Sequence, residues 1–473
     1  MVFSSISFLL IFFPIVMILY HIIGKRYKNT FILIASIFFY TWGAPNFIFI
    51  LLFSAVLDFY LIRFLYLAET INRKRFFLIL SLTMNIGLLA YFKYANFFIE
   101  NMTKVFLEFG LNSVEWTKII LPIGISFYTF QTLTYSIDVY RNVHKPLNKL
   151  KDYLFFILLF PQMIAGPIVR FNQIADEIQD RDESIDDKLQ GFIRFSIGLG
   201  KKVLIANVLG EQADLIMNQP VESISSIAAW LGIITYSFQI YFDFAGYSDM
   251  AIGLGKMLGL HFPENFNNPY TSRSISEFWR RWHITLGDFM KNYLYIPLGG
   301  NRVSRVHLFF NLWLVFLISG FWHGASWNFV IWGAFHGMFL ILDKLFLLKL
   351  LNKIGQIPSM LITFLIVMVG WVFFRIEHFT QATGYLKKMF SFQTGQTSLL
   401  VSNTFCIVLF FSIVFSWFTT LEIGRSIERN VFYRRTASVN YYIVMLLVSI
   451  VLFVLSVASI TSADFNPFIY FRF

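Results

Sequence analysis

The most informative part of the sequence reads Gly320-Phe321-Trp322-His323-Gly324-Ala325-Ser326-Trp327-Asn328, and it separates two apolar runs, 308–319 and 329–342. This position predicts that the imidazole of His323 lies at or below a membrane surface, where an ionisable side chain is costly and commonly functional. Because the pKa of histidine lies near neutrality, such a group can take a proton from a hydroxyl and return it. Its small neighbours allow a helix or a ligand to approach closely. The stretch predicts a catalytic base; the alternative is a histidine that joins two helices by one hydrogen bond.

Composition places the chain among the polytopic membrane proteins. Of its 473 residues, 57% are hydrophobic, only 14% are charged, and 59 are phenylalanine. Globular domains are roughly half apolar and about a quarter charged, so a soluble core does not need so many apolar side chains. The formal net charge of +11 comes from short basic clusters between apolar runs, which fits membrane topology better than nucleic-acid binding. The single cysteine, Cys406, excludes a disulfide within the chain.

Apolar runs near the length of about 20 residues that crosses a bilayer recur along the whole chain. They lie near 4–23, 30–43, 46–66, 76–98, 118–138, 151–170, 190–217, 222–250, 304–322, 326–343, 357–375, 402–421 and 441–460. Several are short or interrupted by glycine and proline, which predicts about 10 to 12 crossings with additional re-entrant helices. The expected fold class is an all-α polytopic membrane bundle, with residues 1–473 as a single membrane-embedded domain. The first run has no basic leader and no small-residue cleavage site, so we interpret it as a retained span.

The basic loops predict the orientation of the chain. Lysines and arginines follow the first, third and fifth runs, at 25–28, 73–75 and 141–151. Placing them on the cytoplasmic side puts the N-terminus outside. Arginines at 425–435 precede the last run, so the C-terminus is also expected outside, which requires an even number of crossings.

The run at 151–170 is interrupted by Ile164-Ala165-Gly166-Pro167. A helix broken at membrane depth is tolerated only against protein or a wet cavity. We therefore expect a re-entrant element on the cytoplasmic side, with an ordinary kinked span as the alternative.

Residues 261–303 form the longest stretch of low hydrophobicity, and tryptophans and arginines mix in its middle. This mixture predicts an amphipathic helix at the level of the lipid headgroups. Three arginines near one entrance would also attract an anionic donor, such as a phosphorylated thioester carrier, with a plain headgroup anchor as the alternative. These are Arg273, Arg280 and Arg281.

A metal site is not expected from the histidines. On one straight helix, His323 and His336 would lie about 220° apart and could not share an ion. His283 has no second ligand at helical spacing, and no cysteine or paired carboxylate accompanies it.

Two acids, Asp243 and Asp249, lie in an otherwise apolar helix, and their spacing puts them on different faces. We expect Asp243 to pair with an arginine of the 273–281 cluster in a structural role. The glycines at 246, 253 and 255 predict close helix packing.

The sequence closes with an aromatic segment at 464–473, directly after the last apolar run. Such a segment is typical of an interfacial belt. The hydroxyl of Tyr470 could instead carry an acyl group if a base were near.

Taken together, these segments resemble the membrane-bound O-acyltransferase superfamily, and within it the bacterial alginate O-acetyltransferase subfamily, which also holds peptidoglycan O-acetyltransferase subunits. The blocks that carry the resemblance occur in order along essentially the whole chain, at 1–5, 122–130, 161–168, 242–253, 277–283 with 293–302, 321–325 and 468–470.

The resemblance implies an acyltransferase whose superfamily histidine corresponds to His323, with a second position, often histidine or asparagine, at His283. It implies a central funnel, an acyl thioester donor such as acetyl-CoA on the cytoplasmic side, and no tightly bound cofactor. It further implies the bacterial cytoplasmic membrane, an acceptor polysaccharide outside it, and a separate extracytoplasmic esterase-like partner. Tyr470 stands where a tyrosine acyl carrier has been proposed in such systems.

Two alternatives stay open. The first is D-alanyl transfer to teichoic acid from a carrier protein, within the same superfamily. The second is a transporter or flippase for glycan or lipid, which broken helices also fit. A transporter, however, gives no reason for an intramembrane histidine flanked by small residues, and the sequence does not identify the acceptor polymer.

Overall fold

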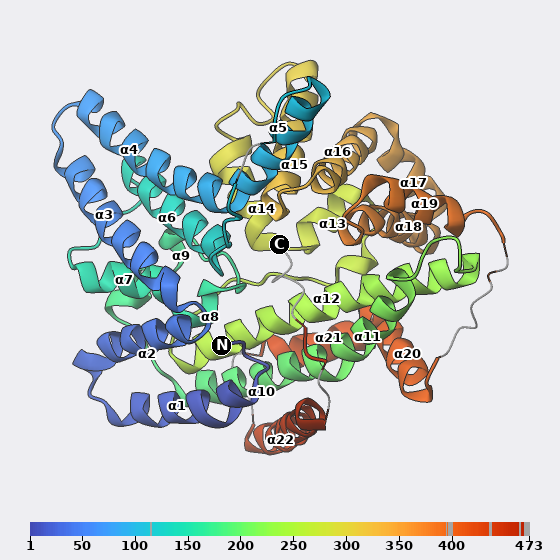
Figure 1. Cartoon of the computed structure of the whole chain (residues 1–473). Coiled ribbons are helices and arrows are strands. Elements are labelled where there is room, and N and C mark those ends of the chain that lie inside the picture. Colours follow the sequence, from blue (N-terminus) through green and yellow to red (C-terminus); the bar gives the residue numbers. More distant parts are fainter. Residues whose placement is uncertain (114–115, 394, 396–400, 435–437, 463–464, 468–473) are drawn as a thin grey trace. The chain divides into compact units, whose positions relative to one another are not determined.

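The computed structural model describes the chain apart from residues 114–115, 394, 396–400, 435–437, 463–464 and 468–473 (Figure 1). Every regular element in the described ranges is a helix, as the sequence predicts. The chain forms two compact units: unit 1 comprises residues 1–182 with 259–262, and unit 2 comprises 183–258 with 263–473. Each is described by itself, and the single-domain interpretation stays a prediction.

Six helical segments are long and apolar enough to cross a membrane, in the part of the chain that the structure describes. They are Pro45–Leu67, Ile71–Glu108, Arg305–His323, Gln356–Arg375, Asn403–Thr420 and Val439–Ser462, with the shorter apolar segment Ser7–Ile22 in addition. The polytopic membrane class is therefore confirmed. The number of crossings stays a prediction. Whether the shorter or more polar helices also cross depends on the position of the bilayer.

Unit 1 contains the first nine α-helices. They are α1 (Phe13–Ile22), α2 (Lys28–Gly43), α3 (Ile48–Leu67), α4 (Ile71–Leu89), α5 (Ala95–Glu108), α6 (Ile125–Tyr140), α7 (Leu150–Leu158), α8 (Phe160–Met163) and α9 (Phe171–Gln179). The run predicted to be re-entrant is broken, and the first break lies at Leu159, before the predicted Gly-Pro. Helix α7 has nine residues and rises about 14 Å, about half of the hydrocarbon core. A plain continuous span is therefore excluded, and the re-entrant interpretation stays a prediction.

A buried carboxylate joins four helices of unit 1. Asp58 of α3 accepts hydrogen bonds from Ser81 (2.5 Å) and Asn85 (3.0 Å) of α4, and from Tyr153 of α7 (2.7 Å). Ser136 of α6 also donates to it, at 3.4 Å. Neutral donors therefore satisfy both carboxylate oxygens of a side chain that is fully buried.

Unit 2 contains the remaining α-helices. They are α10 (Ile185–Gly200), α11 (Asn207–Met217), α12 (Ser226–Met257), α13 (Ile275–Arg281), α14 (Ile284–Met290), α15 (Arg305–His323), α16 (Trp327–Leu342), α17 (Leu348–Ile354), α18 (Gln356–Arg375), α19 (Phe379–Met389), α20 (Asn403–Trp417), α21 (Glu422–Phe432) and α22 (Val439–Ser462). A π-helical segment, η5 (Lys201–Ala206), links α10 to α11. Helices α10 and α11 pack along the long α12, and α15 and α16 pack side by side (Figure 1).

Glycines bring α10 and α12 into backbone contact, as the sequence predicts for residues 246 and 253. A Cβ on Gly198 would lie 2.6 Å from the Gly246 carbonyl oxygen, and a Cβ on Gly246 would lie 2.7 Å from that of Gly198. Gly191 and Gly253 face each other in the same reciprocal way. Only glycine permits this approach at both crossings.

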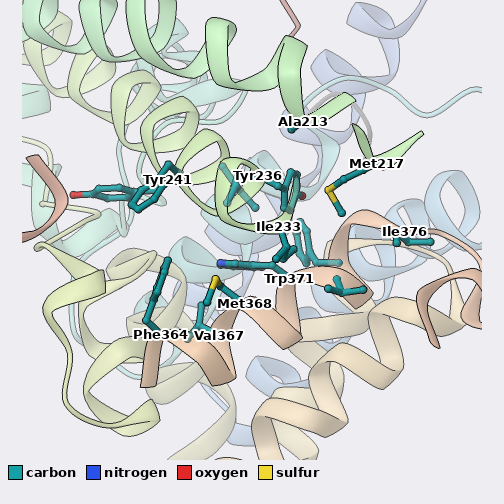
Figure 2. Close-up of a cluster of buried hydrophobic side chains, with 14 of the residues drawn as sticks. Ala213, Met217, Ile233, Tyr236, Tyr241, Phe364, Val367, Met368, Trp371 and Ile376 are labelled. Atoms are coloured by element: carbon teal, nitrogen blue, oxygen red, sulfur yellow. The ribbon is translucent and has the colours of Figure 1, made fainter. Parts of the chain in front are cut away.

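Aromatic side chains fill the core between α12 and α18. Figure 2 shows Trp371 of α18 among Tyr236 and Ile233 of α12 and the neighbouring side chains of α11. The Trp371 indole donates to the hydroxyl of Tyr270 (3.3 Å), which in turn donates to the Ser237 carbonyl (2.5 Å). This cluster supports the end of α18 that contacts His323.

Candidate active site

His323 is the last residue of α15, and the small residues 324–326 turn the chain into α16. The two helices meet through Gly320 and Gly333, where a Cβ would collide with the carbonyl oxygens of Phe329 and Phe316 respectively. The predicted close approach of a helix beside His323 is therefore confirmed. The turn is also tied to α18, because Asn328 donates a hydrogen bond to the Ile376 carbonyl.

The imidazole of His323 is 4% exposed and lies among aromatic rings. Its ring centroid is 4.9 Å from that of Trp322, 5.1 Å from Trp332 of α16 and 5.4 Å from Phe374 of α18. The interplanar angles of 68° to 87° are those of edge-to-face contacts. These rings pack around the imidazole and hold it in place.

His283 occupies the junction between α13 and α14, where its backbone adopts the left-handed conformation at φ +46°. Such a conformation is uncommon for residues other than glycine and is often found at functional sites. The side chain is buried, and its ring lies 4.7 Å from Phe244 and 6.4 Å from Trp322. The Trp322 ring therefore lies near the rings of both predicted site histidines, His283 and His323.

Asn265 determines which ring nitrogen of His283 carries the proton. Its Oδ1 accepts hydrogen bonds from the backbone N–H (3.3 Å) and the hydroxyl (2.9 Å) of Thr285. A backbone N–H can only donate, so this atom is an oxygen, and His283 Nδ1, 3.0 Å away, must donate to it. Burial lowers the pKa of His283 to about 3, so the ring is neutral at physiological pH and Nε2 is its basic nitrogen. No sequence pattern pointed to Asn265, because it lies in an irregular loop.

His336 is a second residue that the sequence did not place in the site. The assumption that His323 and His336 share one straight helix was wrong. The chain turns at residues 324–326, so the two histidines lie on different helices. Both imidazoles pack on Trp332, each with 5.1 Å between ring centroids. The His336 ring also contacts Trp279 of α13 at 5.0 Å and is fully buried.

The three candidate donor-binding arginines differ in their contacts and exposure. Arg281 forms an ion pair with Glu277 at 2.8 Å and bonds to Thr271 at 3.2 Å. Arg273 and Arg280 have exposed side chains. Arg281 is thus bound within its own loop, and the other two arginines remain accessible to an anion.

The acids of α12 pair with cations other than the one predicted for Asp243. Its carboxylate lies 2.9 Å from the Lys202 ammonium, and both side chains are buried. Asp249 pairs with Arg194 and Lys201, each at 2.7 Å. The predicted arginine partner from 273–281 was therefore wrong, and the two acids bind separate cations.

A cavity of about 550 Å³ lies between α10, α12, α20 and α21. Its walls are mainly apolar, with Phe411, Phe415 and Phe432 among them, and they include Asn265. The cavity therefore reaches the amide that bonds His283, although neither His283 nor His323 lines it. Tyr470 lies outside the described residues.

In its described part the chain is thus an all-helical membrane protein with two buried histidines near one tryptophan. The sequence profile of the membrane-bound O-acyltransferase family matches residues 82–374. The chain belongs to this family and is an O-acyltransferase.

Three curated relatives show which branch it resembles. It is 44% identical to the probable alginate O-acetylase of Pseudomonas aeruginosa, over 85% of this chain and 77% of the relative. It is 37% identical to the peptidoglycan O-acetyltransferase of Helicobacter pylori, over 82% and 80% of the two chains. The teichoic acid D-alanyltransferase of Streptococcus thermophilus is 30% identical, over only 48% of this chain.

Proposed function

We propose that this chain transfers an acetyl group from a thioester donor to hydroxyl groups of an extracytoplasmic polysaccharide. The observation that carries the proposal is the pair of buried histidines, His323 and His283, whose rings both lie near Trp322. The similarity to O-acetylases of two different polysaccharides supports acetyl as the acyl group. It leaves alginate, peptidoglycan and related polymers as acceptors.

In the proposed reaction, His323 is the general base. It takes the proton from the acceptor hydroxyl while the hydroxyl oxygen attacks the thioester carbonyl carbon. The carbon–sulfur bond then breaks, and the thiolate receives the proton from the imidazolium as it leaves. General base catalysis of this kind contributes about 10²–10⁴-fold.

His283 has a supporting role in this mechanism. Its neutral ring presents Nε2 as an acceptor, so it can orient the acceptor hydroxyl or a water in the same site. Because burial prevents protonation near neutral pH, the ring does not introduce a positive charge beside His323.

The donor that we propose is acetyl-CoA, bound without any tightly held cofactor. Its phosphates would meet the accessible guanidinium groups of Arg273 and Arg280. Arg273 lies just before α13. At the start of that helix the Ser276 N–H donates to Asp343, which directly follows the end of α16. His323 precedes the start of α16, a helix about 24 Å long, so the donor would have to span most of that length.

The chain would act in the bacterial cytoplasmic membrane, with both termini outside and an extracytoplasmic esterase-like partner completing the transfer. The basic loops support this orientation. If Tyr470 is an acyl relay, as we propose, its hydroxyl is the one that attacks the thioester at His323. The partner then cleaves the resulting tyrosyl ester and passes the acetyl group to a polysaccharide hydroxyl. D-alanyl transfer is less well supported, because the similarity to the D-alanyltransferase covers about half of the chain.

The proposal is tested by deleting the gene and measuring alkali-labile acetate in purified peptidoglycan and in exopolysaccharide. We expect acetate to be lost from one of them and restored by the wild-type gene but not by His323→Ala. Purified protein with radiolabelled acetyl-CoA should release free thiol in a His323-dependent way. Unchanged acetate in both polymers would contradict the proposal, and loss of D-alanine from teichoic acid would replace it.

A further inference from the structure

Lys202 of η5 carries a buried positive charge in unit 2. Its side chain is 1% exposed. The ammonium lies 2.9 Å from the Asp243 carboxylate, donates to the Asn207 side-chain oxygen at 2.7 Å, and donates to the Pro467 carbonyl. Three oxygen-bearing groups therefore surround the ammonium, with Asn207 and Pro467 as hydrogen-bond acceptors and Asp243 as the counter-ion. One of the two acceptors, Pro467, belongs to the segment that follows α22.

A second hydrogen bond joins the same segment to the same place. The Asn207 side chain uses its oxygen for Lys202 and its amide N–H for Asn466, at 3.2 Å. The ring of Phe465 lies against α11, where a Cβ on Gly210 would be 3.2 Å from it. Residues 465–467 therefore contact α11 and η5 through one ring, one side-chain amide and one carbonyl.

These contacts indicate a specific binding site, because they satisfy a buried charge. A buried ion pair in a membrane protein is costly unless its remaining hydrogen-bonding capacity is satisfied, and such charges usually mark function. Without the Pro467 carbonyl, one N–H of Lys202 would lose its acceptor, at a cost of about 1–3 kcal/mol or more for a charged group. Proline has no N–H, so this residue offers only the carbonyl that the ammonium requires.

We propose that Lys202, Asn207 and Asp243 form a docking site for residues 465–467. The site holds residues 465–467 against the protein core instead of in the lipid interface. By holding these residues, the site limits where the proposed acyl relay, Tyr470, can reach. This role in positioning Tyr470 rests on the proposed function. A belt of aromatic side chains at the membrane surface would not need a hydrogen bond from a buried, paired cation.

Docking is tested first without any reference to activity. In a Cys406→Ser background, Asn207→Cys with Asn466→Cys places two thiols where the two amides now touch. Mild oxidation of the membrane-embedded protein should join residues 207 and 466 by a disulfide, detected as a linked peptide by mass spectrometry. The control is Leu215→Cys with Asn466→Cys, on the exposed part of the same helix, which should stay unlinked. Absence of the 207–466 link, or equal linking in both pairs, would overturn the docking site.

Positioning is tested by acetyl transfer to polysaccharide in Asn466→Ala and Asn207→Ala, each alone and combined with Tyr470→Phe. We expect a loss of about tenfold or more in the single variants, and no further loss when Tyr470 is already replaced, because both changes act on one step. Additive losses would indicate a general structural effect and would overturn the positioning role. If wild-type protein itself transferred no acetyl group, the proposed function would fail, while the disulfide would still decide whether residues 465–467 dock.

Discussion

The Nδ1 of His283 lies 3.0 Å from the Oδ1 of Asn265 and donates a hydrogen bond to it. Because the same oxygen also accepts the backbone N–H of Thr285, its identity as an acceptor is fixed by the fold. The consequence is a histidine with one defined tautomer, whose basic nitrogen lies on the opposite side of the ring.

Replacing Asn265 should therefore change the pH dependence of the reaction. In Asn265→Asp, a carboxylate beside the ring favours the imidazolium and raises the pKa of His283, so the acid limb of the pH–rate profile should move to higher pH. Asn265→Ala should lower the rate constant for transfer about fivefold or more, since a buried hydrogen-bond donor loses its acceptor. Thr285→Val is the control, because it removes one donor to Asn265 without touching His283. A profile in Asn265→Asp that matches the wild type would contradict the role.

His323→Ala should abolish transfer and leave the protein folded in the membrane. The expected loss in the rate constant is about 10²-fold or more, because the general base is removed. Thiol release from labelled acetyl-CoA measures the loss, and size-exclusion chromatography in detergent reports folding. His336→Ala is the informative comparison, because that ring packs on the same Trp332 from the other helix. A variant at position 323 that keeps full activity would remove the proposed mechanism.

Acid should destabilise the protein through His283. Its pKa is about 3 in the folded protein and near 6.5 in an unfolded chain, so unfolding takes up a proton between these values. The free energy of unfolding should fall as the pH drops from about 6.5 towards 3. Thermal unfolding at pH 7.5 and pH 4.5 measures the effect, and His283→Asn should lose less stability on acidification than the wild type. Equal acid sensitivity of the two proteins would argue against a buried neutral imidazole.

Gly198→Ala should destabilise unit 2, because the new methyl group would lie 2.6 Å from the Gly246 carbonyl oxygen. Overpacking of this kind costs about 1–3 kcal/mol. Gly200→Ala is a matched control two residues further on, where the nearest atom would lie at 3.6 Å. That change should be neutral or stabilising, since alanine favours a helix over glycine by about 1 kcal/mol. Melting temperatures of the two variants in detergent give the comparison, and equal melting temperatures would contradict the close crossing.

Arg273→Ala with Arg280→Ala should raise the KM for acetyl-CoA and leave kcat nearly unchanged, because an exposed contact with the donor phosphates contributes mainly to binding. Removing two such contacts should raise KM about tenfold. Arg281→Ala should raise KM less, because its guanidinium already pairs with Glu277. A rise in KM that is largest for Arg281→Ala would reverse the assignment of these arginines.

Local properties of the chain could be predicted from the sequence. Hydropathy needs only neighbouring residues, so the apolar runs, the membrane class and the buried position of His323 follow from composition and spacing. The need for a close helix approach at residues 246 and 253 was likewise visible in the glycines themselves. The membership of the O-acyltransferase family followed from short blocks in a fixed order, and the family profile confirmed it.

Partners distant in sequence could not be predicted. The chain offers many cations to Asp243, and hydropathy does not distinguish among them, so the choice of Lys202 was decided by how η5 packs on α12. The assumption of one straight helix through His323 and His336 failed because the turn at 324–326 is a matter of backbone geometry.

Composition and spacing alone predict that a membrane protein of this family carries an imidazole in an apolar environment. The packing of distant segments was needed to show that His283 lies near Trp322, that Asn265 fixes a tautomer, and that residues 465–467 return to a buried ammonium. The physical reason is that burial depends on the average character of a segment, whereas a hydrogen bond depends on the relative positions of two atoms to within a few tenths of an ångström.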